Sequence, residues 1–150
     1  MTLVAFTVNG RAIPQGSKTI GRTKTGRSYV REDNAALDPW RKAVAGQARQ
    51  AWNREPLDDP VDLAVVFYFK RPSSHYGTGR NAHVIKASAP LFPHDTRGTD
   101  LDKLTRAVAD ALTGIVIVDD VRIVTLTAAK VYAAHDHATI EVSYALKGVL

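Results

Sequence analysis

The sequence predicts an α+β fold, a single two-layer domain in which two helices pack on a small mixed sheet and long basic loops join the elements. Three observations support this class. The chain has 150 residues, 45% of them hydrophobic, which is enough to close one core and too little for two. Short β-branched runs alternate with two segments of helical periodicity. The connections between them are rich in glycine, proline, lysine and arginine.

The first third of the chain predicts a strand, a basic ribbon and a helix. Leu3–Val8 is apolar and β-branched and precedes a turn signal, so a strand is expected there. Residues 11–31 predict an exposed basic loop or ribbon, with Ser28–Val30 its strand-like piece. Asp38-Pro39 is typical of a helix start, with Asp as the N-cap and Pro at the first helical position. The apolar stripe of this helix comprises Trp40, Val44, Ala48, Ala51 and Trp52.

The remainder predicts three strands, a long loop and a second helix. Val61–Phe69 has the composition of a buried strand, and residues 70–99 form an irregular basic stretch of the kind that is usually functional or disordered. Residues 101–113 have one apolar face and end at Gly114, a natural C′ residue. We interpret residues 121–133 and 139–146 as two strands of a hairpin that turns at His135-Asp136-His137.

The composition excludes several classes of protein. The chain has no cysteine, which rules out a disulfide framework, thiolate zinc sites and a cysteine nucleophile. No apolar run approaches the roughly 20 residues of a membrane helix, so we expect a cytoplasmic protein with no membrane partner. Residues 16–19 read Gly-Ser-Lys-Thr but lack the first glycine of a phosphate-binding loop, so no nucleotide cofactor is expected.

The charge is unevenly distributed along the chain. The net charge is +5, yet residues 1–31 hold six basic side chains and no acid, whereas residues 100–120 hold five aspartates against Lys103 and Arg106. The basic edge of the first predicted helix faces either solvent or a phosphate backbone. An acidic island within a basic chain suits a protein that binds a cation and a polyanion together.

The aspartates of the D-L-D and D-D segments are the candidate metal ligands. Residues two apart share a face only in extended chain, so Asp100 must lie before the helix if it is to converge with Asp102. A third ligand can come from Asp119 or Asp120, provided that the chain after Gly114 folds back toward the N-terminus of the helix. Hard carboxylate oxygens suit Mg²⁺ or Mn²⁺, which can activate water at a phosphodiester.

Each of these residues also has a structural explanation. Thr99 with Asp102 resembles a capping box, and Asp119-Asp120 can form a plain turn. Asp102, Arg106 and Asp110 have the spacing of an i, i+4 charge ladder. The residue pattern alone therefore leaves open a non-catalytic DNA-binding protein whose aspartates brace a helix. His135-x-His137 is interpreted as part of a turn rather than as a metal site.

The segment from Thr99 to Gly114, followed by Asp119-Asp120-Val121, resembles the signature of the RusA-like Holliday-junction resolvases, crossover junction endodeoxyribonucleases carried mostly by phages and prophages. That signature runs D-[LV]-D-[NK]-L, then D-A-L-T, then D-D before a strand. The Pro14-x-Gly-Ser-Lys18 loop and the long loop from Arg71 to Arg97 also resemble phage members.

The resemblance implies a homodimeric, Mg²⁺-dependent endonuclease that nicks four-way DNA junctions symmetrically, with Mn²⁺ able to substitute, in recombination and repair within a bacterial host cell. It assigns Asp100, Asp102 and Asp120 as catalytic metal ligands, with Asp119 beside them in a possible indirect role. Arg106 stands where the family has a functional lysine, so it is assigned to phosphate contact or charge stabilisation. A less selective flap or branched-DNA endonuclease of phage replication or packaging remains an alternative. The predicted DNA-binding residues are Lys18, Arg22, Lys24, Arg27, Arg97, Lys103 and Arg106.

Overall fold

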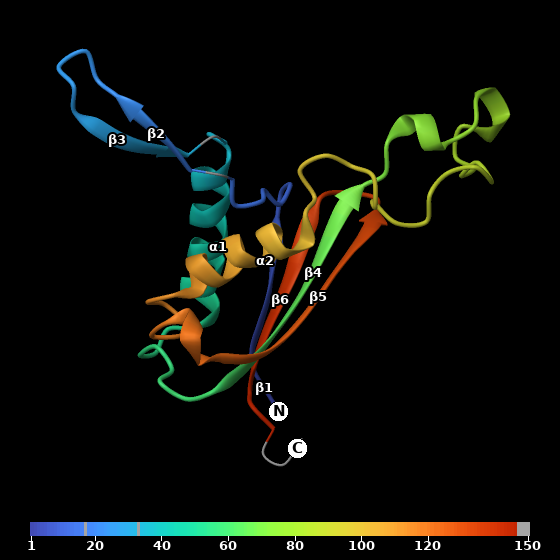
Figure 1. Cartoon of the computed structure of the whole chain (residues 1–150). Coiled ribbons are helices and arrows are strands. Elements are labelled where there is room, and N and C mark those ends of the chain that lie inside the picture. Colours follow the sequence, from blue (N-terminus) through green and yellow to red (C-terminus); the bar gives the residue numbers. More distant parts are fainter. Residues whose placement is uncertain (17, 33, 147–150) are drawn as a thin grey trace.

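A mixed four-stranded sheet with two helices on one face forms the body of the protein, in agreement with the predicted α+β class (Figure 1). The computed structural model describes residues 1–16, 18–32 and 34–146, with the backbone alone for 18–20 and 29–32. The sheet order is β1-β6-β4-β5. Its strands are β1 (Thr2–Asn9), β4 (Val61–Lys70), β5 (Ile123–Ala133) and β6 (His137–Tyr144). The sheet is mixed because β4 is parallel to β5 and antiparallel to β6.

The predicted hairpin between the last two strands is wrong, because β5 and β6 lie on opposite edges of β4 and do not pair with each other. The turn at residues 134–136 crosses the end of β4, where the Lys70 N–H donates to Asp136 Oδ1 at 2.8 Å. Every second residue of β4 from Val61 to Phe69 is buried. A strand with this many apolar residues is most stable in the centre of a sheet, where it has a partner strand on each side.

The helices α1 (Leu37–Ala51) and α2 (Leu101–Leu112) cover the face of the sheet on which the alternate residues of β4 are buried. The stripe of α1 packs into the core through Trp40, Val44 and Ala48, as predicted, whereas Ala51, which was assigned to the same stripe, is exposed. The predicted start of α1 is two residues late, because Ala36 rather than Asp38 is the N-cap residue and Leu37 rather than Pro39 is the first helical residue. Asn34 Oδ1 accepts from the Ala36 N–H at 3.0 Å, and the buried Leu37 already belongs to the first turn.

The second helix begins at the predicted residue and ends one residue before the predicted end, with Thr113 as its C-cap. Its buried side chains include Leu104, Val108 and Leu112, and the chain leaves it through Gly114, which has a φ of +83°. This is the left-handed C′ conformation that favours glycine. Because α2 lies in the crossover between the parallel strands β4 and β5, its N-terminus emerges near the upper end of the sheet (Figure 1).

Two projections extend from this upper end (Figure 1). The first is the basic hairpin, made by β2 (Lys18–Arg22) and β3 (Ser28–Glu32), which confirms the predicted basic ribbon. The second, which we call the arm, comprises residues 73–89 and contains the short 3-10 helices η1 (Ser73–His75) and η2 (Gly79–Asn81). In the described part of the chain, no helix has the length and apolarity needed to cross a bilayer.

Candidate active site

The D-L-D segment lies where the long loop meets α2. Asp100 is the N-cap residue in extended conformation, with φ −60° and ψ 112°, so it stands outside the helix as predicted. Its carboxylate makes no capping hydrogen bond and instead lies 3.4 Å from Lys103 Nζ. Asp102 is exposed in the first turn and has no hydrogen-bonding or ionic partner among the described side chains. Neither carboxylate is therefore occupied in capping, and the capping-box interpretation is wrong.

Thr99 is instead a buried anchor for the residue that follows it. It is fully buried, and its hydroxyl donates to the Thr96 carbonyl at 2.7 Å. Lys130 Nζ reaches from β5 and donates to Thr99 O at 2.9 Å and to Thr99 Oγ1 at 3.1 Å. A charged donor from the sheet therefore holds the backbone directly before Asp100, which fixes where the D-L-D carboxylates can point.

The loop that contains Pro14 and Gly16 lies against the same turn of α2. The Gln15 N–H donates to the Lys103 carbonyl at 3.1 Å, so two segments that are far apart in sequence meet at this helix end. Gln15 Oε1 is buried with no hydrogen-bond partner among the described residues. An uncoordinated amide oxygen therefore lies beside the first turn of α2.

The D-D pair occupies the short 3-10 helix η3 (Asp120–Arg122) and its N-cap. Asp119 Oδ1 accepts from the Val121 N–H at 3.0 Å and thereby caps η3. That bond lowers the pKa of Asp119, and the hydrogen bond with the Asp120 carboxyl lowers it further. The same shared hydrogen bond raises the pKa of Asp120, with smaller contributions from desolvation and from the charges of Asp119 and Asp110. These carboxylates are thus close enough to repel one another, which a cation would relieve.

The structure divides the predicted ligands into two groups. After Gly114 the chain folds back along the C-terminal part of α2, so that η3 lies beside the end of that helix, where the charge of Asp110 acts on Asp120 (Figure 1). Asp102 and Asp110 are eight residues apart, or about 12 Å along the helix axis. Across the described residues, no three acidic or histidine side chains gather as a group able to hold a metal ion. The donors have the hard-oxygen chemistry of Mg²⁺, but η3, which contains Asp120, lies beside the C-terminal end of α2 rather than at its D-L-D end (Figure 1).

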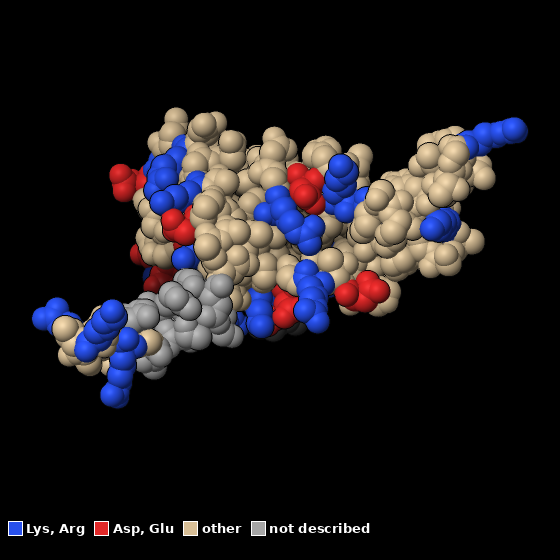
Figure 2. Space-filling model, turned by 90° about the horizontal axis from the view of Figure 1, so that it is seen from above, with Lys and Arg blue, Asp and Glu red and all other residues tan. Residues whose placement is uncertain are grey.

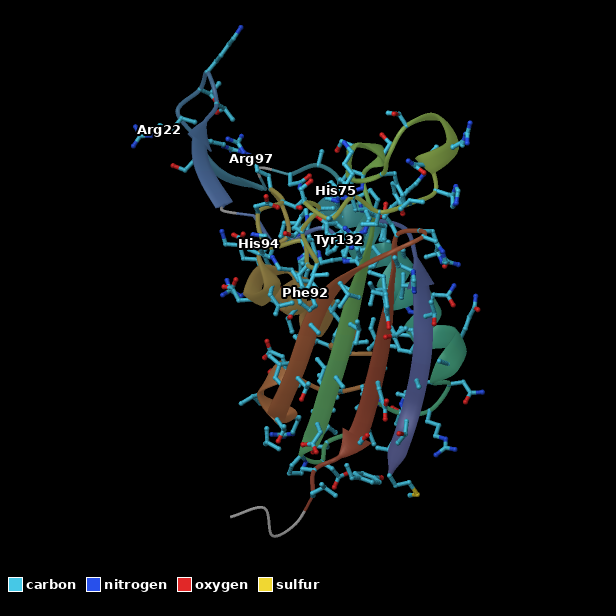
Figure 3. All side chains as sticks on the ribbon, turned by 90° about the vertical axis from the view of Figure 1, so that its right-hand side faces the viewer. Arg22, His75, Phe92, His94, Arg97 and Tyr132 are labelled. Carbon is cyan, nitrogen blue, oxygen red and sulfur yellow. The ribbon has the colours of Figure 1, made fainter. Side chains whose placement is uncertain are left out.

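The predicted DNA-binding cations lie mainly on the hairpin and around the start of α2. Arg22, Lys24 and Arg27 are exposed on the hairpin, and Arg22 and Arg97 lie on the same side of the molecule, above α2 (Figure 3). The Lys18 side chain lies outside the described residues. Arg106 is exposed and forms no ion pair with any described residue, so the predicted charge ladder through Asp102 and Asp110 is wrong. Asp110 instead lies 3.9 Å from Arg41 of α1.

Two residues near the site were not identified from the sequence. Lys130 stands opposite the buried Phe67 in the sheet register and so points to the helix side of the sheet. In the sequence, the feature that could have indicated this role is a lysine within an otherwise apolar part of the strand. Asp110, in the last turn of α2, contributes a negative charge that raises the pKa of Asp120. His135 and His137 stack at 4.4 Å in the turn and at the start of β6, as expected of a structural pair.

Comparison with known proteins identifies relatives of this chain. The family model described as Endodeoxyribonuclease RusA matches residues 9–143, which include the Pro14 loop, the D-L-D helix and the D-D pair. The chain is also 29% identical over 133 residues to "Uncharacterized protein YqaN" of Bacillus subtilis (strain 168), covering 89% of this chain and 90% of that protein. Because the family match spans most of the sequence, DNA is the substrate and phosphodiester cleavage is the reaction. The chain belongs to the RusA endodeoxyribonuclease family.

Proposed function

We propose that this protein is a Mg²⁺-dependent, structure-selective endonuclease that resolves four-way DNA junctions by paired symmetric nicks. The observation that supports this most strongly is the position of the D-L-D carboxylates. Asp100 and Asp102 are exposed at the N-terminal end of α2, have no capping role, and lie between two basic projections. Such a surface attracts the phosphate backbone while offering a cation hard oxygen ligands.

Asp100 and Asp102 would hold the metal, and Asp120 is the proposed third ligand because Asp119 is engaged in capping η3. When bound, the metal supplies an activated water and neutralises charge on the phosphoryl oxygens. Lys103 and Arg106 lie in the same helix turns and would contact the phosphates flanking the cut. Arg106 stabilises charge without donating a proton, because a guanidinium does not deprotonate in proteins.

A homodimer follows from the proposed reaction. Two symmetric nicks need two active sites, and a two-fold protein matches the approximate two-fold symmetry of a junction. We place the protein in the cytoplasm of a bacterial host, encoded by a phage or prophage, where junctions arise during recombination and repair.

The test measures nicking of an immobile four-way junction, a flap and a linear duplex in one buffer, with a titration of Mg²⁺. The proposal predicts paired nicks at opposing positions of the junction, none in EDTA, and restoration by Mn²⁺. Equal cutting of flaps and junctions would support the less selective branched-DNA endonuclease instead. Absence of any product over the whole metal titration would favour a non-catalytic DNA-binding protein.

A further inference from the structure

We propose that the arm, residues 73–89, is a second surface that binds the DNA backbone. On a branched DNA the arm would contact one duplex, and the basic hairpin would contact another. This inference rests on the proposed junction selectivity, and it adds a surface that the D-L-D helix and the hairpin do not include. The partner it fits is duplex DNA leaving a branch point.

The charge of this region is uncompensated. Between Leu63 and His94 the sequence contains no aspartate or glutamate, and it contains Lys70, Arg71, Arg80 and Lys86. Arg80 and Lys86 are exposed and form no ion pair or side-chain hydrogen bond with any described residue. On the face seen from above, Lys and Arg are the only charged residues at the outer ends of both projections (Figure 2). Unpaired exposed cations on a protein that cuts DNA are available to replace the counterions of phosphates.

The arm has an ordered backbone that can present these charges in a fixed geometry. Its two sides pair at Tyr76 and Ile85, and the Lys86 N–H donates to the His75 carbonyl at 2.8 Å. Gly77 lets the outer turn close, because a Cβ there would lie 2.7 Å from the Asn81 Cβ and carbonyl oxygen. The η2 helix, which contains Arg80, consequently lies at the outer end of the projection (Figure 1).

The base of the arm is joined to the body beside the D-L-D segment. The Arg71 guanidinium donates to the Pro90 carbonyl at 2.8 Å, lies 3.3 Å from His75 Nδ1, and stacks 4.3 Å from the centre of the Tyr132 ring. His75 packs edge-on against the same ring at 5.4 Å (Figure 3). Tyr132 also lies two residues from Lys130, which anchors Thr99. These contacts therefore fix the direction of the arm relative to the proposed metal ligands Asp100 and Asp102.

The two projections point away from each other, the hairpin from beside the start of α1 and the arm from the upper end of β4 (Figure 1). A straight duplex seated at the D-L-D segment meets their inner parts, whereas Arg80 lies at the outer end of one of them. A second DNA duplex that leaves a branch point at the cut can run along the outer part of the protein arm. The charge on the arm would thus contribute to binding of branched DNA more than to binding of linear DNA.

The experiment measures the affinity of the whole protein in EDTA for an immobile four-way junction and for a linear duplex of the same length, between 50 and 200 mM KCl. The test variant is Arg80→Gln with Lys86→Gln. Arg22→Gln with Lys24→Gln removes two charges from the hairpin. Arg49→Gln with Arg54→Gln is the charge-matched control, because both residues lie at or beyond the C-terminal end of α1, away from the projections (Figure 1). Thermal melting of each variant verifies folding.

For the arm variant we expect the salt slope on the junction to fall by about 1.8 for each bound protomer, since each phosphate contact contributes about 0.9, with an affinity loss of about tenfold or more. Its affinity for the linear duplex should stay within about twofold. The hairpin variant should weaken binding to both DNAs, and the control to neither. Unchanged junction binding by the arm variant would overturn the inference, and so would an equal loss on both DNAs. If the wild type itself shows no preference for the junction, the proposed function fails instead.

Discussion

Replacing Lys130 by methionine should destabilise the protein and misplace the D-L-D segment. The substitution keeps the length of the side chain and removes a charged donor that holds Thr99 O at 2.9 Å and Thr99 Oγ1 at 3.1 Å. Thr99 is fully buried, so water cannot readily replace that donor. A hydrogen bond from a charged group contributes about 1.5–3 kcal/mol, and Lys130 is half-buried, so we expect a loss of about 2–3 kcal/mol in the free energy of unfolding.

In a domain of this size, 1 kcal/mol shifts the melting temperature by about 2–4 °C, so the expected decrease is about 4–12 °C. Differential scanning calorimetry measures it. Lys130→Arg retains a donor and should recover most of the loss. Lys42→Met is the matched control, since Lys42 forms an exposed i, i+4 pair with Asp38 that contributes less than about 0.5 kcal/mol.

The same variant separates positioning from binding. Junction affinity in EDTA should stay near that of the wild type, because Lys130 faces the helix side of the sheet rather than the DNA. The nicking rate of the bound complex should fall, because the backbone before Asp100 loses its anchor. If Lys130→Met melts within 1 °C of the wild type, the substitution costs about 0.5 kcal/mol or less in the free energy of unfolding. That result would refute this reasoning.

Two further predictions concern the acid pair and the base of the arm. Asp119→Ala should lower the melting temperature, because the Val121 N–H loses its cap. Asp120→Ala should leave the melting temperature unchanged or slightly raised, because it removes a carboxylate repelled by Asp119 and Asp110. Equal destabilisation by the two substitutions would contradict their different roles. Arg71→Lys should loosen the arm, since an ammonium cannot both donate to Pro90 O and stack as a guanidinium does on Tyr132. Limited proteolysis within residues 73–89 should then accelerate severalfold, and wild-type cleavage kinetics would show that Arg71 is not the anchor.

The parts of the fold set by local patterns could be predicted. The helix from Leu101 to Leu112 follows from its apolar face and from Gly114, and the extended Asp100 follows from the requirement that neighbours two apart share a face. The start of α1 was misjudged, because Asp38-Pro39 has good capping chemistry but the buried Leu37 and the turn at Asn34 begin the helix earlier.

The parts set by long-range pairing could not be predicted. Alternation identifies β5 and β6 as strands, but it does not show that β4, which comes before both in sequence, lies between them. The position of Asp120 depends on how far the chain after Gly114 returns along α2, and backbone hydrogen bonds of Val116 and Val118 with Leu57 hold that segment in place. The role of Lys130 likewise depends on which residue faces it across the sheet.

The most direct test of the central claim compares Asp100→Asn and Asp102→Asn with the wild type for junction binding in EDTA and for nicking in Mg²⁺. Asp38→Asn is the control, because Asp38 is an exposed acid in the first turn of the other helix. If these carboxylates hold the metal, both variants should bind the junction as the wild type does, or slightly more tightly, and lose nicking by at least a hundredfold, while Asp38→Asn cuts normally. Undiminished nicking by both variants would contradict the account.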